Sequence, residues 1–147
     1  MFRGNAPARI DEKGRLKVPN AFRSAIESTY GRELFVTSLT GEYVRLYPMA
    51  VWLEVERRLA EVPSSNPSKQ RFIDRVSFFG QVASLDKQGR VVIPQLLRES
   101  AAMAGEVSVL GLQNHLGVWN QKRLQERLFK KEPFTDEDGR VLSGFGI

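Results

Sequence analysis

Cysteine is absent from this chain of 147 residues. Without thiols the protein forms no disulfide, no thiolate zinc site and no cysteine nucleophile, and such a sequence suits a reducing compartment. Long apolar runs are also missing, since no segment approaches the roughly 20 apolar residues that a membrane-spanning helix needs. Residues 1–10 lack the apolar core and cleavage site of a signal peptide. We therefore expect a cytoplasmic protein without a membrane segment.

Catalytic and cofactor motifs are missing too. The single histidine, His115, follows Asn114 in a segment that predicts a hairpin turn, and no Ser or Cys nucleophile motif accompanies it. The hydrolase motif G-x-S-x-G, the Walker A loop and the dinucleotide motif G-x-G-x-x-G do not occur. Residues 136–139, DEDG, are too few for a calcium loop. The sequence therefore predicts a protein that is not an enzyme, with no catalytic residue, no metal site and no cofactor.

Positive charge is present in excess, and it is unevenly distributed. The chain has 22 Lys and Arg against 17 Asp and Glu, a net charge of +5. Residues 1–25 hold six of these basic residues and two of the acidic ones, so this segment carries +4 and the rest of the chain only +1. A basic segment of this kind indicates an acidic partner such as nucleic acid.

The sequence contains one internal repeat. Residues 11–19, DEKGRLKVP, recur 75 positions later as residues 86–94, DKQGRVVIP. A repeat defines the structural units of a chain, and we predict a first repeat over 1–61, a linker and helix over 62–75, a second repeat over 76–130 and a C-terminal tail over 131–147. Each repeat has only about 60 residues, a size at which a lone domain is marginally stable. We therefore expect the two copies to interleave in one barrel-like body, or to oligomerise.

Periodicity and turn residues predict the same order of elements in both repeats, namely turn, strand, helix, hairpin and helix. The expected elements of the first repeat are a strand over 15–18, a helix from Pro19 to Gly31, a hairpin over 34–47 and a helix from Pro48. Those of the second repeat are a helix between Pro94 and Gly105, a hairpin over 107–119 and a helix from Asn120. Between the repeats we expect a short helix over 69–75 and a strand over 76–85. The tail from Glu132 lacks periodicity and is expected to be mobile.

The repeated D-x-x-G-R motif has turn chemistry. Asp11 and Asp86 are expected to cap the two turns, and Gly14 and Gly89 to take a positive φ. The arginine that follows each glycine is placed to pair back onto the aspartate. This structural role explains the Asp and the Gly without any function.

The basic residues of the first copy need a different explanation. Lys13, Arg15 and Lys17 fall on one side of the turn and strand, where their mutual repulsion favours an anionic ligand. The second copy has Gln88 and Val92 at the positions of the two lysines, so it keeps the turn and loses most of the charge. A two-stranded ribbon can enter the DNA major groove, where Arg donates two hydrogen bonds to guanine and Lys neutralises phosphate. We predict DNA contacts at Lys13, Arg15 and Lys17, with Lys87 and Arg90 as secondary contacts; a solvated basic face is the alternative.

Four segments together resemble a known family. They are MFRG at 1–4, the repeat copy at 11–19, R-F-x-x-R-x-x-F-F at 71–79, and L-D-K-Q-G-R-V-x-I-P-x-x-L-R at 85–98. In this order and spacing they resemble the MraZ family of bacterial transcriptional regulators, over about residues 1–130. Each half is similar to a SpoVT-AbrB domain. The resemblance implies a mixed α+β fold, mainly β, in which two AbrB-like repeats form an intertwined double-split (swapped-hairpin) β-barrel with flanking helices.

The resemblance also implies a function and a set of residues. It implies a cytoplasmic, nucleoid-associated regulator that binds double-stranded promoter DNA of the division and cell-wall gene cluster. Such proteins assemble as homo-oligomeric rings, whose subunits bind short repeated boxes. By position, the DNA-contacting region falls on Lys13, Arg15 and the neighbouring Arg3 and Lys17. Pro7, where a strand residue is expected, and the acidic tail depart from the pattern.

One alternative class stays open at this point. The basic face could bind an acidic protein, which would make the chain an interaction module of the antitoxin-like or scaffold kind.

Overall fold

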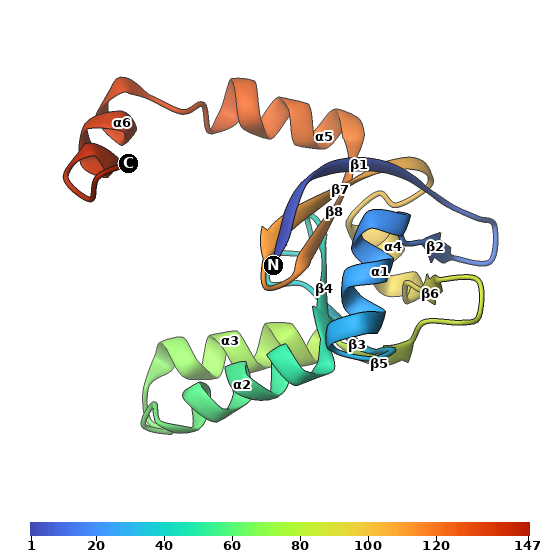
Figure 1. The fold of residues 1–147 in the computed structure, drawn as a ribbon. Helices are drawn as coiled ribbons and strands as arrows, with labels where there is room; N and C mark the ends of the chain where they lie inside the picture. Colours follow the sequence, from blue (N-terminus) through green and yellow to red (C-terminus); the bar gives the residue numbers. More distant parts are fainter.

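The computed structural model describes residues 1–147 and places eight strands in one antiparallel sheet, with six α-helices around it (Figure 1). The strands are β1 (Phe2–Ile10), β2 (Arg15–Lys17), β3 (Glu33–Thr37), β4 (Val44–Pro48), β5 (Gln81–Ser84), β6 (Arg90–Val92), β7 (Gly105–Gln113) and β8 (Leu116–Asn120). The helices are α1 (Asn20–Thr29), α2 (Met49–Ala60), α3 (Pro67–Phe78), α4 (Gln95–Ser100), α5 (Gln121–Glu126), the π-helical turn η1 (Arg127–Lys131) and α6 (Asp136–Ser143). None of the helices is both long and apolar enough to cross a membrane.

The two repeats are interleaved in this sheet. The strand order is β5-β3-β4-β8-β7-β1-β2-β6, so that β3 pairs with β5, β4 with β8, β1 with β7 and β2 with β6 across the repeats. The longest of these ladders runs from Phe2 opposite Gln113 to Ile10 opposite Gly105. The mixed fold and the shared, nearly closed barrel are therefore confirmed, whereas the boundaries of the repeats stay a prediction.

The alternation of the short strands places their apolar residues in a common core. Leu16 and Val18 of the first repeat are almost fully buried, and so are their counterparts Val91 and Ile93 of the second. Side chains on a strand alternate between its two faces, so the residues between them point outward. A smaller apolar cluster around Trp52 lies where α2 and α3 cover the sheet.

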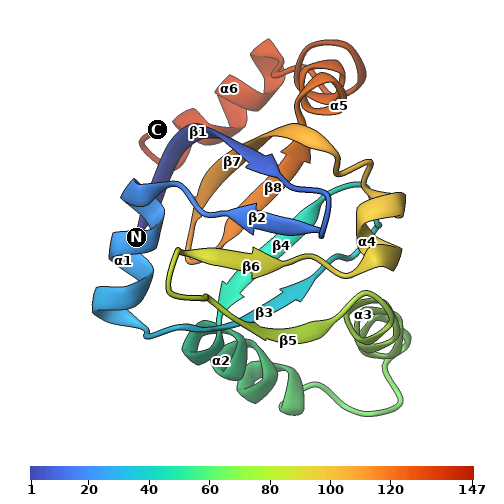
Figure 2. The same ribbon diagram turned by 90° about the vertical axis from the view of Figure 1, so that its right-hand side faces the viewer.

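A pair of reciprocal hydrogen bonds joins the two copies of the repeated motif. The amide of Val18 donates to the carbonyl of Gly89 at 3.0 Å, and the amide of Ile93 donates to the carbonyl of Gly14 at 2.8 Å. These reciprocal bonds are the pattern expected when an approximate twofold axis relates the two copies. Figure 2 shows β2 and β6 side by side in the middle of one face, between α1 and α4.

The connection between the repeats differs from the prediction. Helix α3 runs to Phe78, so residues 76–78 are helical and the expected strand over 76–85 is reduced to β5. The helix begins with Asn66, whose side chain accepts from the amide of Ser68 at 2.9 Å, and with proline in the first turn. Val76 is buried in the cluster around Trp52, and its carbonyl accepts from Thr37 Oγ1 at 2.8 Å. Tertiary packing thus overrides the strand preference of this Val- and Phe-containing segment.

The C-terminal tail also differs, because it contains a helix. Thr135 and Asp138 form a capping box, in which Thr135 Oγ1 accepts from the amide of Asp138 at 3.1 Å and Asp138 Oδ2 accepts from the amide of Thr135 at 2.9 Å. The tail therefore contains a helix that its lack of periodicity did not predict, whereas its mobility stays a prediction. Helix α4 is shorter than expected and ends well before Gly105, since Ala102 takes a φ of 52°.

Strand β1 continues through Pro7, which lies opposite Ser108 of β7. On its other side β1 pairs with β2 only at Ile10. Most of β1 is thus an edge on that side, where the missing N–H of a proline is tolerated.

Candidate nucleic-acid interface

The first copy of D-x-x-G-R folds into a turn that is held by its aspartate. Asp11 Oδ1 accepts from the amides of Lys13 at 3.0 Å and Arg15 at 2.9 Å, and Asp11 Oδ2 accepts from Arg15 Nε at 2.7 Å. Gly14 takes a φ of 79°. The backbone N–H of Arg15, followed by the Arg15 side chain, lowers the pKa of the Asp11 carboxyl. The carboxylate therefore stays ionised and fixes the position of the guanidinium.

The second copy repeats this geometry at a distance of 75 residues. Asp86 Oδ1 accepts from the amides of Gln88 at 2.9 Å and Arg90 at 2.8 Å, and Asp86 Oδ2 accepts from Arg90 Nε at 2.8 Å. Gly89 takes a φ of 75°, and the backbone N–H of Arg90 is the main cause that lowers the pKa of Asp86. In both turns only the Nε of the arginine is bonded within the chain, so that its two terminal nitrogens are left for a ligand.

The two turns lead into a pair of strands with a cationic outer face. In the β2–β6 ladder Lys17 lies directly opposite Arg90, and Arg15 opposite Val92. These side chains are on the outer face because Leu16 and Val91 between them are buried. We call this face, with Arg15, Lys17 and Arg90, the basic ribbon. Like charges directly across two strands are destabilising, so an anion on this face relieves a repulsion that the fold itself imposes.

The surroundings of the two turns are not equal. In the second turn Gly89 packs against Arg23, whose Nε donates to Glu27 at 3.0 Å and whose Nη2 donates to the carbonyl of Lys87 at 2.9 Å. In the first turn Gly14 packs against Arg98, whose Nε is buried and has no partner. The residue that corresponds to Glu27, 75 positions later, is Ala102. The first turn thus has a neighbouring guanidinium without the carboxylate that the second turn has.

Arg98, which lacks a carboxylate partner, borders a hollow beside the first turn. The hollow has a volume of about 700 Å³ and is lined by residues that include Arg9, Lys13, Arg15 and Arg98, with Asp11 and Glu12 as the acidic members. Sequence reasoning missed Arg9 and Arg98. Comparing the two repeats position by position would have pointed to Arg98, because its acidic partner is absent in only one of them.

The predicted residues do not all come together. Arg15, Lys17 and Arg90 share the basic ribbon, and Lys13 and Lys87 are exposed in the two turns. Arg3 is opposite Leu112 near the start of β1, and the strand from there to Ile10 measures about 23 Å at about 3.3 Å per residue. Arg3 therefore lies far along the strand from the first turn, and its contact with DNA stays a prediction.

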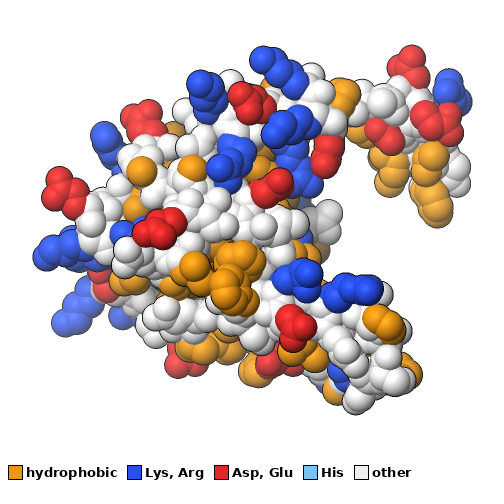
Figure 3. Space-filling view, turned by 180° about the vertical axis from the view of Figure 1, so that it is seen from behind, with side chains coloured by type: hydrophobic (Ala, Val, Ile, Leu, Met, Phe, Trp, Pro, Cys, Tyr) orange, Lys and Arg blue, Asp and Glu red, His pale blue; other side chains and the backbone are white.

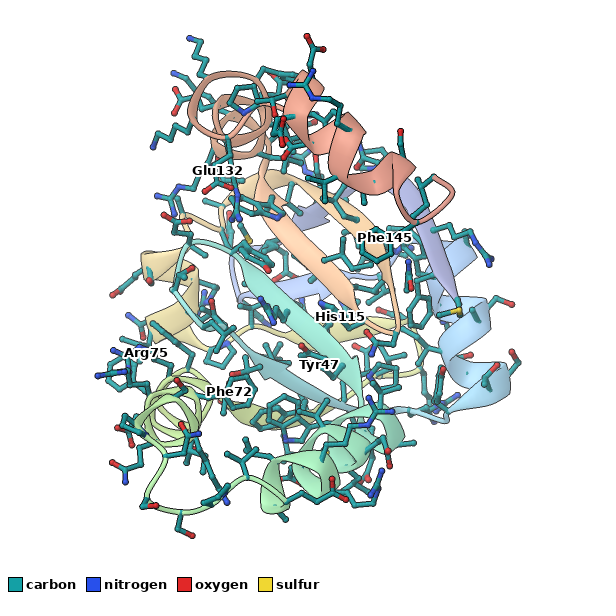
Figure 4. The ribbon with its side chains drawn as sticks, turned by 90° about the vertical axis from the view of Figure 1, so that its left-hand side faces the viewer. Tyr47, Phe72, Arg75, His115, Glu132 and Phe145 are labelled. Carbon is teal, nitrogen blue, oxygen red and sulfur yellow. The ribbon has the colours of Figure 1, made fainter.

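A second polar cluster is found on the other side of the barrel. Arg45 Nε donates to Tyr43 Oη at 3.0 Å, and its Nη1 donates to Tyr47 Oη at 3.3 Å. The ring of His115 stacks on Tyr47 with centroids 4.5 Å apart, and the two residues lie near each other on the floor of this side (Figure 4). Burial, with the charge of Arg45 as a smaller cause, lowers the pKa of His115 to about 4. The histidine is thus a neutral packing residue of the β7–β8 turn.

No group of three or more His, Asp and Glu side chains is placed to hold a metal ion. The basic ribbon has cations that face outward from two paired strands, and it can bind a polyanion.

Comparison with known proteins gives a consistent result. The sequence profile of one family, described as "MraZ protein, putative antitoxin-like", matches residues 1–75 and 81–143. The chain is 48% identical over 148 positions to the "Transcriptional regulator MraZ" of Koribacter versatilis and 46% identical over 147 to that of Acidobacterium capsulatum, in both cases over the full length of both chains. It is 32% identical over 148 positions to the protein of the same name from Pediococcus pentosaceus, again over both full lengths.

Proposed function

The chain belongs to the MraZ family, and we propose that it is a DNA-binding transcriptional regulator without catalytic activity. Its relatives carry the name of transcriptional regulators. The observation that carries the proposal is the basic ribbon, where Lys17 faces Arg90 across two strands and Arg15 projects beside them. The site of action would be the cytoplasm, on the nucleoid.

The mechanism begins with arginines that are oriented before DNA binds. Asp11 holds Arg15 through Nε, and Asp86 holds Arg90 in the same way. The terminal nitrogens are then free to donate two parallel hydrogen bonds to N7 and O6 of a guanine. A lysine such as Lys17 neutralises a phosphate and fixes the position of the ribbon without reading sequence. Fixing a side chain in advance reduces the entropy that binding would otherwise cost.

The first repeat would contribute more than the second. It has Lys13 and Lys17 where the second has Gln88 and Val92, and it borders the hollow with the unpaired Arg98. Arg3 and Lys87 would add weaker contacts at the margins.

Affinity would come from several copies acting together. The proposed target is the promoter of the division and cell-wall gene cluster, with short repeated boxes, and the proposed assembly is a homo-oligomeric ring. Binding of one box makes binding of the next one intramolecular, which multiplies the affinity by roughly 10²–10⁴ without any new contact.

The two turns offer a matched experiment. Arg15→Ala and Arg90→Ala each remove a side chain that an aspartate holds in the same geometry, so both substitutions remove the same contact within the turn. We expect Arg15→Ala to weaken binding to the DNA upstream of the gene by about 5- to 150-fold, equivalent to about 1–3 kcal/mol, and to relax base preference. Arg90→Ala should cost less. Equal losses, or none, in a mobility-shift titration would disprove the assignment to the first repeat.

The competing function is an interaction module that binds an acidic protein, either antitoxin-like or a scaffold. Salt dependence separates the two, because log K for duplex DNA falls by about 0.9 per unit of log salt for each phosphate neutralised. A flat salt profile with DNA would favour the interaction module.

A further inference from the structure

The guanidinium of Arg98 has no counter-charge in its own chain. Its Nε is the only buried side-chain nitrogen or oxygen atom that lacks a hydrogen-bond partner, and none of the ion pairs of the chain includes this arginine. A guanidinium stays charged at neutral pH, and a charge that is partly buried is unfavourable unless it is paired. An anion beside Arg98 would therefore relieve a cost that the fold itself creates.

The hollow beside the first turn offers such an anion several donors. Its walls carry four basic and two acidic side chains, a net charge of +2, and one of the acidic ones, Asp11, is already bonded to Arg15. Arg9 and Lys13 are exposed in the wall and form no ion pair. An arginine donates two parallel hydrogen bonds to the oxygens of a phosphate, and a lysine attracts a phosphate as a point charge. The side chains of the hollow therefore suit a phosphate group.

The hollow is continuous with the basic ribbon. Arg15 belongs to the ribbon and also lines the hollow. Arg9 lines the hollow and, together with Lys17 of the ribbon, borders a second depression. Figure 3 shows Lys and Arg side chains projecting at the left-hand edge of the molecule, which is the side of the two turns in Figure 1. A polyanion on the ribbon therefore passes the hollow, and the phosphate within reach of Arg98 is one of the DNA backbone.

The second turn lacks these free cations. Ser84 and Gln88 take the places of the two exposed basic residues of the hollow. The arginine that packs on the second turn, Arg23, donates to Glu27 and to the carbonyl of Lys87. The donors of this guanidinium are thus engaged within the chain, so that the two ends of the ribbon differ in their capacity to hold a phosphate.

This difference gives the ribbon a direction. The two turns lie at opposite ends of the ribbon, because β2 and β6 are antiparallel (Figure 2). The DNA backbone has an approximate twofold symmetry of its own, so that a symmetric ribbon would fit the groove equally well in two orientations. Phosphate contacts fix the orientation of a protein on the duplex. A phosphate contact at one end only would therefore favour one orientation over the other.

We propose that the hollow beside the first turn is a binding site for one phosphate of the DNA backbone, held by Arg98 with Arg9 and Lys13, and that this phosphate determines which way round the ribbon lies on its box. The inference rests on the proposed function, because it requires DNA on the ribbon. It adds to that function a phosphate site and an orientation.

Three variants test the phosphate site. Ala104 is exposed and lines the hollow, so Ala104→Glu brings a carboxylate into the hollow to pair with Arg98. Ala104→Gln has the same size without the charge. Thr29→Glu adds the same charge at the exposed position that stands 75 residues earlier, in the other repeat. In a salt titration of promoter binding, Ala104→Glu should lower the slope of log K against log salt by about 0.9 for each bound copy, and the two controls should keep the slope of the unaltered chain.

Ethylation of single DNA phosphates tests the orientation. With the unaltered chain, ethylation of a phosphate at one flank of each box should prevent binding, whereas ethylation of the symmetry-related phosphate at the other flank should not. With Ala104→Glu this one-sided interference should disappear, and with Thr29→Glu it should remain. Equal interference at both flanks, or an unchanged pattern with Ala104→Glu, would overturn the inference.

Thermal unfolding shows whether Arg98 accepts the new carboxylate. Ala104→Glu should unfold at the same temperature as Ala104→Gln or at a higher one, because its charge is paired, and a lower temperature would contradict the role given to Arg98. The two proposals fail in different ways. A chain that binds no promoter DNA would disprove the proposed function together with this inference, whereas DNA binding with equal salt slopes in all three variants would disprove the inference alone.

Discussion

At the scale of single residues, the repeated turn depends on an aspartate that binds three donors and on a glycine that has no room for a side chain. Gly14 and Gly89 have positive φ angles, and each lies directly against an arginine of the other repeat. Each of these positions therefore needs a glycine for two reasons: its φ angle is positive, and a Cβ atom would overlap the neighbouring arginine. The two can be separated by experiment.

We predict that Gly14→Ala destabilises the protein more than Gly31→Ala does. Both residues have a positive φ, 79° and 94°, so both substitutions carry the backbone cost of about 1–3 kcal/mol. A Cβ at Gly14 would also lie 2.5 Å from Cζ of Arg98, whereas at Gly31 nothing lies within 4 Å. Urea unfolding measures the difference, and equal midpoints for the two variants would show that Arg98 moves aside freely.

The pH dependence of stability is expected to report on His115. Its pKa is lowered from 6.5 to about 4 in the folded protein, so between these values the unfolded chain binds more protons than the folded one. This contribution to stability is complete above pH 6.5 and is lost as the pH falls toward 4. The pKa values of Asp11, Asp86 and Glu54 are lowered from 3.8, 3.8 and 4.5. The contributions of these carboxyl groups to the free energy of unfolding are therefore lost only at lower pH than that of His115.

The measurement is the free energy of unfolding at pH 7 and pH 4.5. His115→Phe keeps an aromatic ring against Tyr47 and removes the titration, so the loss of stability over this interval should be smaller than in the unaltered chain. The same pH slope in both proteins would refute the assignment.

The sequence predicts some of this residue chemistry and not the rest. The D-x-x-G-R spacing is local, and the turn that it predicts has the hydrogen bonds expected of Asp11 and Asp86. The approach of Lys17 to Arg90 is not local, because it depends on which strands pair and in which register. Arg98 could be recognised only by aligning the repeats and noticing that Ala102 replaces Glu27.

At the scale of elements, three of the six α-helices, α3, α5 and α6, begin at a residue whose side chain caps them. Asn120 caps α5 by accepting from the amide of Arg123 at 3.0 Å, and it also donates from Nδ2 to the carbonyl of Ala102 at 3.1 Å. It therefore joins the start of α5 to the end of α4. Thr135 and Asp138 start α6 in the same local manner. The sequence pattern T-x-x-D predicts this helix start, but an argument from periodicity alone overlooks so short a helix.

We predict that Asn120→Ala lowers the free energy of unfolding by about 1–2 kcal/mol, because it removes a cap and a tertiary hydrogen bond. Asn66→Ala is the control, since Asn66 makes only the cap bond to Ser68, and its loss should be nearer 1 kcal/mol. Chemical denaturation compares the two variants. A loss at Asn66 that equals or exceeds the loss at Asn120 would contradict the second role of Asn120.

At the scale of the whole molecule, the interleaved sheet explains why two marginal repeats make one stable body. Strand β1 pairs along its whole length with β7, and β2 with β6, so neither repeat completes its own sheet. The same interleaving builds the basic ribbon, because its two strands come from different repeats. The short length of each repeat and the presence of two copies predict a shared core. They do not predict which strands pair, because strand pairing is set by long-range contacts.

The most direct test of the ribbon as a DNA-binding surface is a salt titration of promoter binding by the unaltered chain and by Lys17→Val. Valine is the residue of the second repeat at this position, and it removes the repulsion from Arg90. We predict weaker binding, a slope of log K against log salt that is smaller by about 0.9 for each bound copy, and stability that is equal or higher by about 0.2–1 kcal/mol. Unchanged affinity and an unchanged slope would contradict the account.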